Sequence, residues 1–198
     1  MKELKIITLE SIDGVGISTQ VRLLSQQFIQ LGYKIEIFKF SDVQKASEQT
    51  HKIQDLLGNN DKIMIINDGS FAKSIANDML NGYSRNRLEE KYKDILHQYE
   101  CLNHEYRLLN IILLPVDAKI GQKRLVKYAE VSGKKYKMVK DLNRQRDMLN
   151  ILSELNNHVI SRSIEFEIVD IDEDDKILDI NDMIWELLEK FDVKKPSF

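Results

Sequence analysis

The sequence is poor in the residues that cross-link or interrupt a chain, and it has no long apolar run. Cys101 is the single cysteine, so no disulfide can form within the chain, and a reducing, cytoplasmic location is expected. No apolar stretch approaches the roughly 20 residues that a membrane-spanning helix needs, and the first apolar run is too short for a signal peptide. With two prolines, eight glycines, no repeats and no low-complexity linker, the 198 residues are expected to form one domain, 1–198.

A strong charge of one sign is also missing overall. The formal net charge of −3 gives no reason to expect binding to nucleic acid or to an acidic membrane. Locally, however, nine basic residues gather in one stretch: Lys123, Arg124, Lys127, Lys134, Lys135, Lys137, Lys140, Arg144 and Arg146. Such a run is usually a solvated helix face. Here it interrupts two expected helices at Ser132-Gly133, as a basic flap that closes over phosphates would.

Short apolar runs alternate with helical patterns along the chain. Strands are expected at Lys5–Leu9, Lys34–Phe40, Lys62–Asn67, Leu108–Leu114 and Phe166–Ile171. Helices are expected at Ser18–Leu31, Ser41–Leu57, Ser70–Leu80, Arg87–Tyr106, Lys119–Ala129, Asp141–Asn156 and Ile177–Phe191. This order predicts an α/β fold of three layers, with a five-stranded parallel sheet flanked by helices. Because ligands bind beyond the carboxyl ends of such strands, Leu9–Gln20, Asp68 and the segment after Leu114 should share one rim.

The stretch Leu9–Gln20 lies between the first expected strand and the first expected helix, where a phosphate-binding loop would lie. In the pattern G-x-x-x-x-G-K-[ST], Gly16 and Ser18 hold their places, whereas Ser11 and Ile17 replace the first glycine and the lysine. Such loops bind phosphate through converging backbone N–H groups. We therefore expect the phosphates of a donor to lie on Gly14, Val15, Gly16, Ile17, Ser18 and Thr19. The alternative is a plain turn with a Ser or Thr N-cap.

A magnesium site and an acceptor site are expected on the same rim. The Ser18 hydroxyl is the expected Mg²⁺ ligand of a phosphate loop. Asp68 can hold the metal through water or orient an acceptor, although Asp68-Gly69 is also an ordinary turn dipeptide. The histidines lack metal-ligand spacing, so no zinc site is expected.

Together these segments resemble the thymidylate kinases, P-loop enzymes that transfer a phosphoryl group from ATP to dTMP. Leu9–Gln20 looks like the family's F-E-G-x-D-G-x-G-K-S-T-Q, and Asp68-Gly69-Ser70 looks like its D-R-Y/F segment. Leu113–Asp117, followed by Lys123-Arg124, is similar to its L-x-V-D-P…R-x. The resemblance implies ATP and Mg²⁺ as cofactors if the protein is active, and a lid at about 123–146. It also implies substrate contacts by Asp13 and Lys39, catalytic roles for Asp68, Lys134, Lys135 and Arg144, and a homodimer that pairs through the Arg87–Tyr106 region.

The departures from the family pattern fall on cations. Ile17 replaces the loop lysine, Gly69 replaces the arginine of D-R, and no arginine lies between Arg22 and Arg85. Losing one comparable charge-stabilising donor costs on the order of 100- to 1000-fold in rate. Thymidylate kinase activity is therefore expected to be weak or lost. The alternatives are a non-catalytic nucleotide-binding or interaction protein, and a deoxynucleoside kinase, whose acceptor needs no phosphate clamp.

Overall fold

The fold is seen in a computed structural model, which describes residues 3–39, 43–58, 62–132, 142–155 and 164–196. Its strands are β1 (Leu4–Glu10), β2 (Lys34–Lys39), β3 (Ile63–Asp68), β4 (Arg107–Pro115) and β5 (Phe166–Ile171). Its helices are α1 (Ile17–Gln30), α2 (Val43–Gly58), α3 (Phe71–Leu80), α4 (Arg85–Glu105), α5 (Lys119–Ser132), α6 (Leu142–Ser153) and α8 (Ile177–Glu189). Every expected strand and helix is present, with ends that differ by a few residues.

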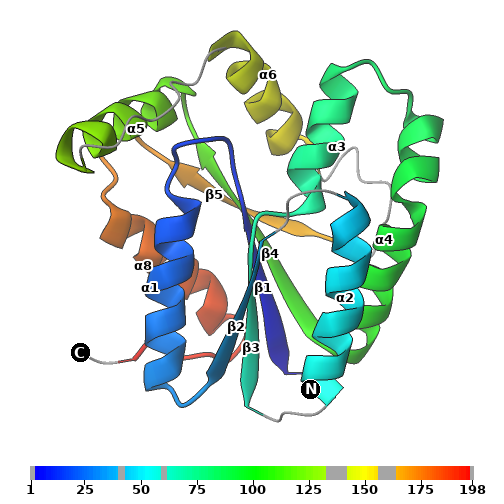
Figure 1. The fold of residues 1–198 in the computed structure, drawn as a ribbon. Helices are drawn as coiled ribbons and strands as arrows, with labels where there is room; N and C mark the ends of the chain where they lie inside the picture. Colours follow the sequence, from blue (N-terminus) through cyan, green and yellow to red (C-terminus); the bar gives the residue numbers. More distant parts are fainter. Residues whose placement is uncertain (1–2, 40–42, 59–61, 133–141, 156–163, 197–198) are drawn as a thin grey trace.

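The five strands form one parallel sheet in the order β2-β3-β1-β4-β5. β1 lies at its centre, where Ile7 pairs with Ile66 of β3 and with Leu109 of β4, and every residue of β1 is buried. Helices α1 and α8 cover one face of the sheet, and α2, α3 and α4 cover the other (Figure 1). The expected three-layer α/β fold is confirmed. Burial on both faces explains why the central strands are apolar throughout rather than alternating.

Buried side chains fix α1 against α8. The Trp185 ring lies 5.4 Å from that of Phe28, and its indole N–H donates to Gln27 Oε1 at 2.9 Å. Gln27 then donates to Asn181 at 2.8 Å, and Asn181 donates to Gln20 at 3.2 Å. Because buried amides are costly unless they are hydrogen-bonded, this chain of amides holds the first turn of α1 in one position.

The apolar side of α4 is used inside the chain. Tyr92 and Tyr99 are buried, together with Leu88, Ile95, Leu96 and Leu102. These tyrosines therefore belong to the core of the chain, and the expected homodimer stays a prediction. In the part of the chain that the structure describes, no helix is both long enough and apolar enough to cross a membrane.

Candidate functional site

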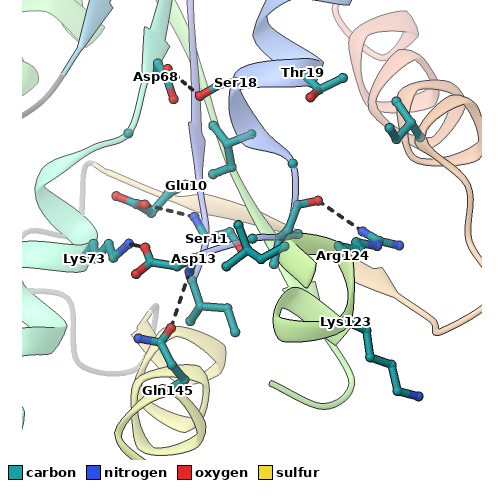
Figure 2. A pocket seen from close by; sticks show the side chains of 18 of the residues that line it. Glu10, Ser11, Asp13, Ser18, Thr19, Asp68, Lys73, Lys123, Arg124 and Gln145 are labelled. Carbon is teal, nitrogen blue, oxygen red and sulfur yellow. Dashed lines mark hydrogen bonds and ion pairs between the residues drawn. The ribbon is translucent and has the colours of Figure 1, made fainter. Parts of the chain in front are cut away.

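A cavity of about 1390 Å³ lies beyond the carboxyl ends of β1 and β3, at the rim that the sequence predicts. Its floor is the segment Glu10–Thr19, and its walls come from Asp68–Ser70, α3, α5, α6 and the segment 173–178, which includes the first two residues of α8. Figure 2 shows Lys73 of α3 and Gln145 of α6 reaching toward Asp13 of this floor. Residues from most of the chain length therefore meet around one loop.

The loop between β1 and α1 has the backbone of a phosphate cradle. Gly14 and Gly16 have φ angles of 84° and 106°, which only glycine adopts at little cost. Thr19 and Gln20 donate their N–H groups to the Gly16 carbonyl. Among the described residues, the N–H groups of Gly14 to Ser18 find no backbone acceptor, and they lie at the positive end of α1. Gly16, not Ser18 or Thr19, is the N-cap of α1, so the alternative of a plain Ser or Thr cap is wrong.

The loop packs directly on α5, which the sequence analysis missed. A Cβ added to Gly14 would lie 2.3 Å from the Gly121 carbonyl oxygen, and a Cβ added to Gly121 would lie 2.3 Å from the Asp13 carbonyl oxygen. The two backbones can approach each other this closely only because both positions are glycine. In the sequence, Gly121 is the residue that could have indicated this contact, because a glycine inside a helical pattern lowers helix stability and is often there for a packing reason.

Ser18 and Asp68 come together as predicted. The Ser18 hydroxyl donates to Asp68 Oδ2 at 3.0 Å, and Lys39 Nζ lies 3.7 Å from the same oxygen. A hydroxyl and a carboxylate are oxygen ligands of the kind that Mg²⁺ takes at phosphate sites. These two residues therefore fit a magnesium site, and Lys39 lies beside it on an exposed strand end.

Asp13 is held from two sides. Lys73 Nζ lies 2.6 Å from Asp13 Oδ1, and the Asp13 N–H donates to Gln145 Oε1 at 3.4 Å. Lys73 is not among the site residues that the sequence predicts. The signal for it was its place in the first turn of a helix that follows a strand end, since that turn must border the rim.

Glu10 is a buried carboxylate that joins β1 to α3. It accepts hydrogen bonds from the Ser11 N–H at 2.9 Å and from the Ser70 N–H at 2.8 Å, and the Ser70 hydroxyl also donates to it. Ser70 in turn caps α3 by accepting the Ala72 N–H. Burial raises the pKa of Glu10, while the charge of Lys73 and these hydrogen bonds oppose the rise.

The two positions at which the family pattern has a cation, Ile17 and Gly69, carry no charge in this chain. Ile17 begins α1 and is half-buried against the main core. Gly69 has a φ of 95°, and its N–H donates to the Leu9 carbonyl at 2.9 Å. Ser11 replaces the first glycine of the pattern, and its hydroxyl donates to the Leu113 carbonyl of β4. The serine thus ties the loop to the sheet, whereas Ile17 leaves the cradle without a lysine.

The basic stretch is only partly described. Arg124 donates to the carbonyls of Val15 and Asp175 at 3.1 and 2.8 Å, and burial lowers its pKa. Lys123 pairs with Glu173 and extends away from the loop (Figure 2). Arg144 donates to Asn77 of α3 and to Asn81, the C-cap residue of that helix. Four predicted lid residues lie outside the described residues: Lys134, Lys135, Lys137 and Lys140. Arg124 therefore has a positioning contact with the loop, and Arg144 joins α6 to α3.

Glu10→Gln is expected to lower the free energy of unfolding by roughly 1–3 kcal/mol, because the amide cannot accept from all three donors. The difference should also depend on pH. A carboxyl whose pKa is raised by folding stabilises the folded state most at pH values below its unfolded pKa, and loses that contribution as pH rises through the folded pKa. The advantage of the wild type over Glu10→Gln should therefore shrink as pH rises above about 4.5.

Urea unfolding from pH 4 to 8 measures this difference, with Glu167→Gln on the exposed side of β5 as the control. A difference in the free energy of unfolding between the wild type and Glu10→Gln that instead widens toward pH 8 would show that the fold stabilises the ionised form of Glu10.

The parallel sheet order, the glycine turn after β1 and the helix that begins from that turn form an architecture that this chain shares with solved kinases. No protein-family model matches the chain, and no curated protein matches it in sequence. Thymidylate kinase from Candida albicans is similar in structure, with a TM-score of 0.58 at 16% identity over 96% of this chain and 93% of that one.

Two other kinases share the fold. Polyphosphate kinase 2 from Arthrobacter aurescens TC1 has a TM-score of 0.62 at 13% identity, over 100% of this chain and 72% of that one. Deoxyadenosine kinase from M. mycoides, solved with bound dCTP, has a TM-score of 0.50 at 17% identity, over 93% and 99%. Identities this low carry the fold and not the substrate, so the predicted P-loop kinase fold is confirmed at that level.

Proposed function

We propose that this protein binds a nucleotide on the loop Gly14–Thr19 and transfers a phosphoryl group to dTMP weakly or not at all. The observation that carries the proposal is Ile17, an apolar side chain at the first residue of α1, packed on the core where the cradle needs a cation. The open N–H groups of the loop favour phosphate binding. Phosphoryl transfer depends mainly on stabilising developing charge, which an isoleucine cannot do.

ATP and Mg²⁺ are the ligands that suit this site. Ser18 and Asp68 would hold the metal, which would supply positive charge to the phosphates. Asp13 would contact the sugar of the acceptor and Lys39 would lie near the acceptor phosphate. Arg124 would keep the loop in place through the Val15 carbonyl. Asp68 and Arg144, with Lys134 and Lys135, stay the proposed residues for any residual transfer.

A deoxynucleoside kinase is the second candidate. The observation that favours it is the pairing of Lys39 with Asp68, because this occupies the one cation that the end of β2 offers among the described residues. An acceptor without a phosphate needs no such cation. Nucleotide binding without catalysis is the remaining alternative, and the same titrations distinguish it.

Isothermal titration with ATP, ADP, dTMP and thymidine tests the binding, and a coupled assay with ATP, Mg²⁺ and dTMP tests the transfer. We expect ATP or ADP to bind and dTMP turnover to stay far below 1 s⁻¹, the low end of ordinary enzyme turnover. Turnover near 1 s⁻¹ or above would contradict weak transfer. Failure of every nucleotide and nucleoside to bind would contradict the binding proposal, and turnover of thymidine but not dTMP would favour the second candidate.

A further inference from the structure

Among the described residues, the basic side chains that line the cavity are Lys73, Lys123, Arg124, Lys127, Arg144 and Lys176. The guanidinium of Arg124 is hydrogen-bonded to two backbone carbonyls, and Lys123 pairs with Glu173 on the far wall. Lys39 lies beside Asp68, on the β3 side. Lys73 also contacts the loop segment, but it does so through the exposed carboxylate of Asp13, whereas Arg124 donates to the backbone carbonyl of Val15.

The position of Lys73 follows from the fold. Glu10 fixes Ser70, Ser70 caps α3, and Lys73 then leaves the first turn of α3 toward the floor of the cavity. Asp13 directly precedes Gly14, where the run of open N–H groups begins. Figure 2 shows the Lys73 side chain reaching from the α3 side to Asp13, where its ammonium lies, with Glu10 nearby.

The ion pair between Lys73 and Asp13 is exposed, so Lys73 can exchange its partner easily. The Lys73 side chain is 37% exposed and that of Asp13 is 57% exposed. Exposed pairs contribute little net free energy, so an incoming phosphate of higher charge can take the lysine from the aspartate at small cost. The long stem of lysine allows its charge to move a short distance without backbone change.

The exposed carboxylate of Asp13 makes a cation favourable for phosphate at this wall. Asp13 lines the cavity directly before the loop, and its negative charge repels an arriving phosphate. Lys73 is adjacent to Asp13, and its charge also acts on Glu10. A phosphate on the loop would therefore meet a favourable potential at this wall only with Lys73 in place.

We propose that Lys73 exchanges Asp13 for a phosphoryl oxygen of the bound nucleotide and supplies a positive charge for nucleotide binding, while the start of α1 at Ile17 stays without a cation. This inference rests on the proposed nucleotide binding by the loop. The phosphoryl group is either one of the phosphates of the nucleotide donor or the phosphate of the acceptor monophosphate, and both present the same anionic oxygens.

The test compares Lys73→Met with Lys73→Arg and with Lys93→Met, a control on the exposed side of α4. Isothermal titration is done with ATP, dTMP and the matching nucleosides adenosine and thymidine. Lys73→Met should weaken binding of ATP or dTMP by about 10- to 100-fold, and the nucleotide affected identifies the donor or the acceptor as the source. Nucleoside affinities and the melting temperature should not change, Lys73→Arg should recover most of the affinity, and Lys93→Met should match the wild type.

The test distinguishes a failure of the proposed nucleotide binding from a failure of the proposed role of Lys73. A wild type that binds neither ATP nor dTMP overturns the proposed function and this inference with it. A wild type that binds, with a Lys73→Met variant that binds both nucleotides equally well, overturns the role of Lys73 alone. Equal losses for nucleotides and nucleosides, or a melting temperature several degrees lower, would show that Lys73 only supports the structure and would also overturn it.

Discussion

Replacing Ile17 by lysine is expected to raise the rate of phosphoryl transfer from ATP to dTMP by about 100-fold or more. Ile17 is the first residue of α1 and directly follows Gly16, so the new ammonium would lie at the open N–H groups of the loop. The methylene stem of lysine can cover the same core surface while its charge stays in water. The kcat/KM for dTMP in a coupled assay measures the gain.

Ile17→Met is the matched control, because it introduces an unbranched stem like that of lysine at the same position and adds no charge. Equal rates for Ile17→Met and Ile17→Lys would mean that side-chain shape, not charge, limits the reaction. An Ile17→Lys variant that binds ATP but stays inactive would place the defect in the acceptor site. Gly69→Arg is a poorer test of that site, because its φ of 95° strains any L side chain there.

The fold was predictable because its signals are local. The buried strands are nearly continuous apolar runs, each helix shows apolar residues on one face, and turns with glycine separate them. The Ser18–Asp68 contact was also predictable, because parallel strands bring their carboxyl ends to one edge. Helix ends were the weakest part: α4 begins at Arg85, since Ser84 is its N-cap, and not at Arg87.

The position of Lys73 was harder to predict than the basic stretch. Charge density pointed to the residues from Lys123 to Arg146, where Arg124 and Arg144 hold backbone or amide oxygens and Lys134 and Lys135 lie outside the described residues. Lys73 is a single lysine in an ordinary helix, and only the cap at Ser70 fixes which way it points. The close approach of Gly14 and Gly121 was equally invisible, because it is a distance between segments more than 100 residues apart.

Gly14→Ala is expected to lower the free energy of unfolding by roughly 2–5 kcal/mol, a cost that combines a strained φ with a backbone clash. The φ of Gly14 is 84°, and its new Cβ would lie 2.3 Å from the Gly121 carbonyl oxygen and 2.8 Å from Leu125 Cγ. Neither the carbonyl oxygen nor the loop can move without shifting α5, which carries Arg124 and its bond to Val15. Urea unfolding measures the change from the transition midpoint at constant m.

Alanine substitutions at three other glycines separate the cost of the strained φ from the cost of the backbone clash. Gly82 has a φ of 80° with no atom near its Cβ position, so Gly82→Ala should show only the φ cost of about 1–2 kcal/mol. Gly121 has an ordinary φ and the same close contact, now with the Asp13 carbonyl, so Gly121→Ala should cost about 1–3 kcal/mol in spite of its gain in helix propensity. Gly58 has neither feature, and Gly58→Ala should be neutral or slightly stabilising. If Gly14→Ala proved no more costly than Gly82→Ala, the loop could move from α5 without loss, and the position of the phosphate cradle would not depend on that helix.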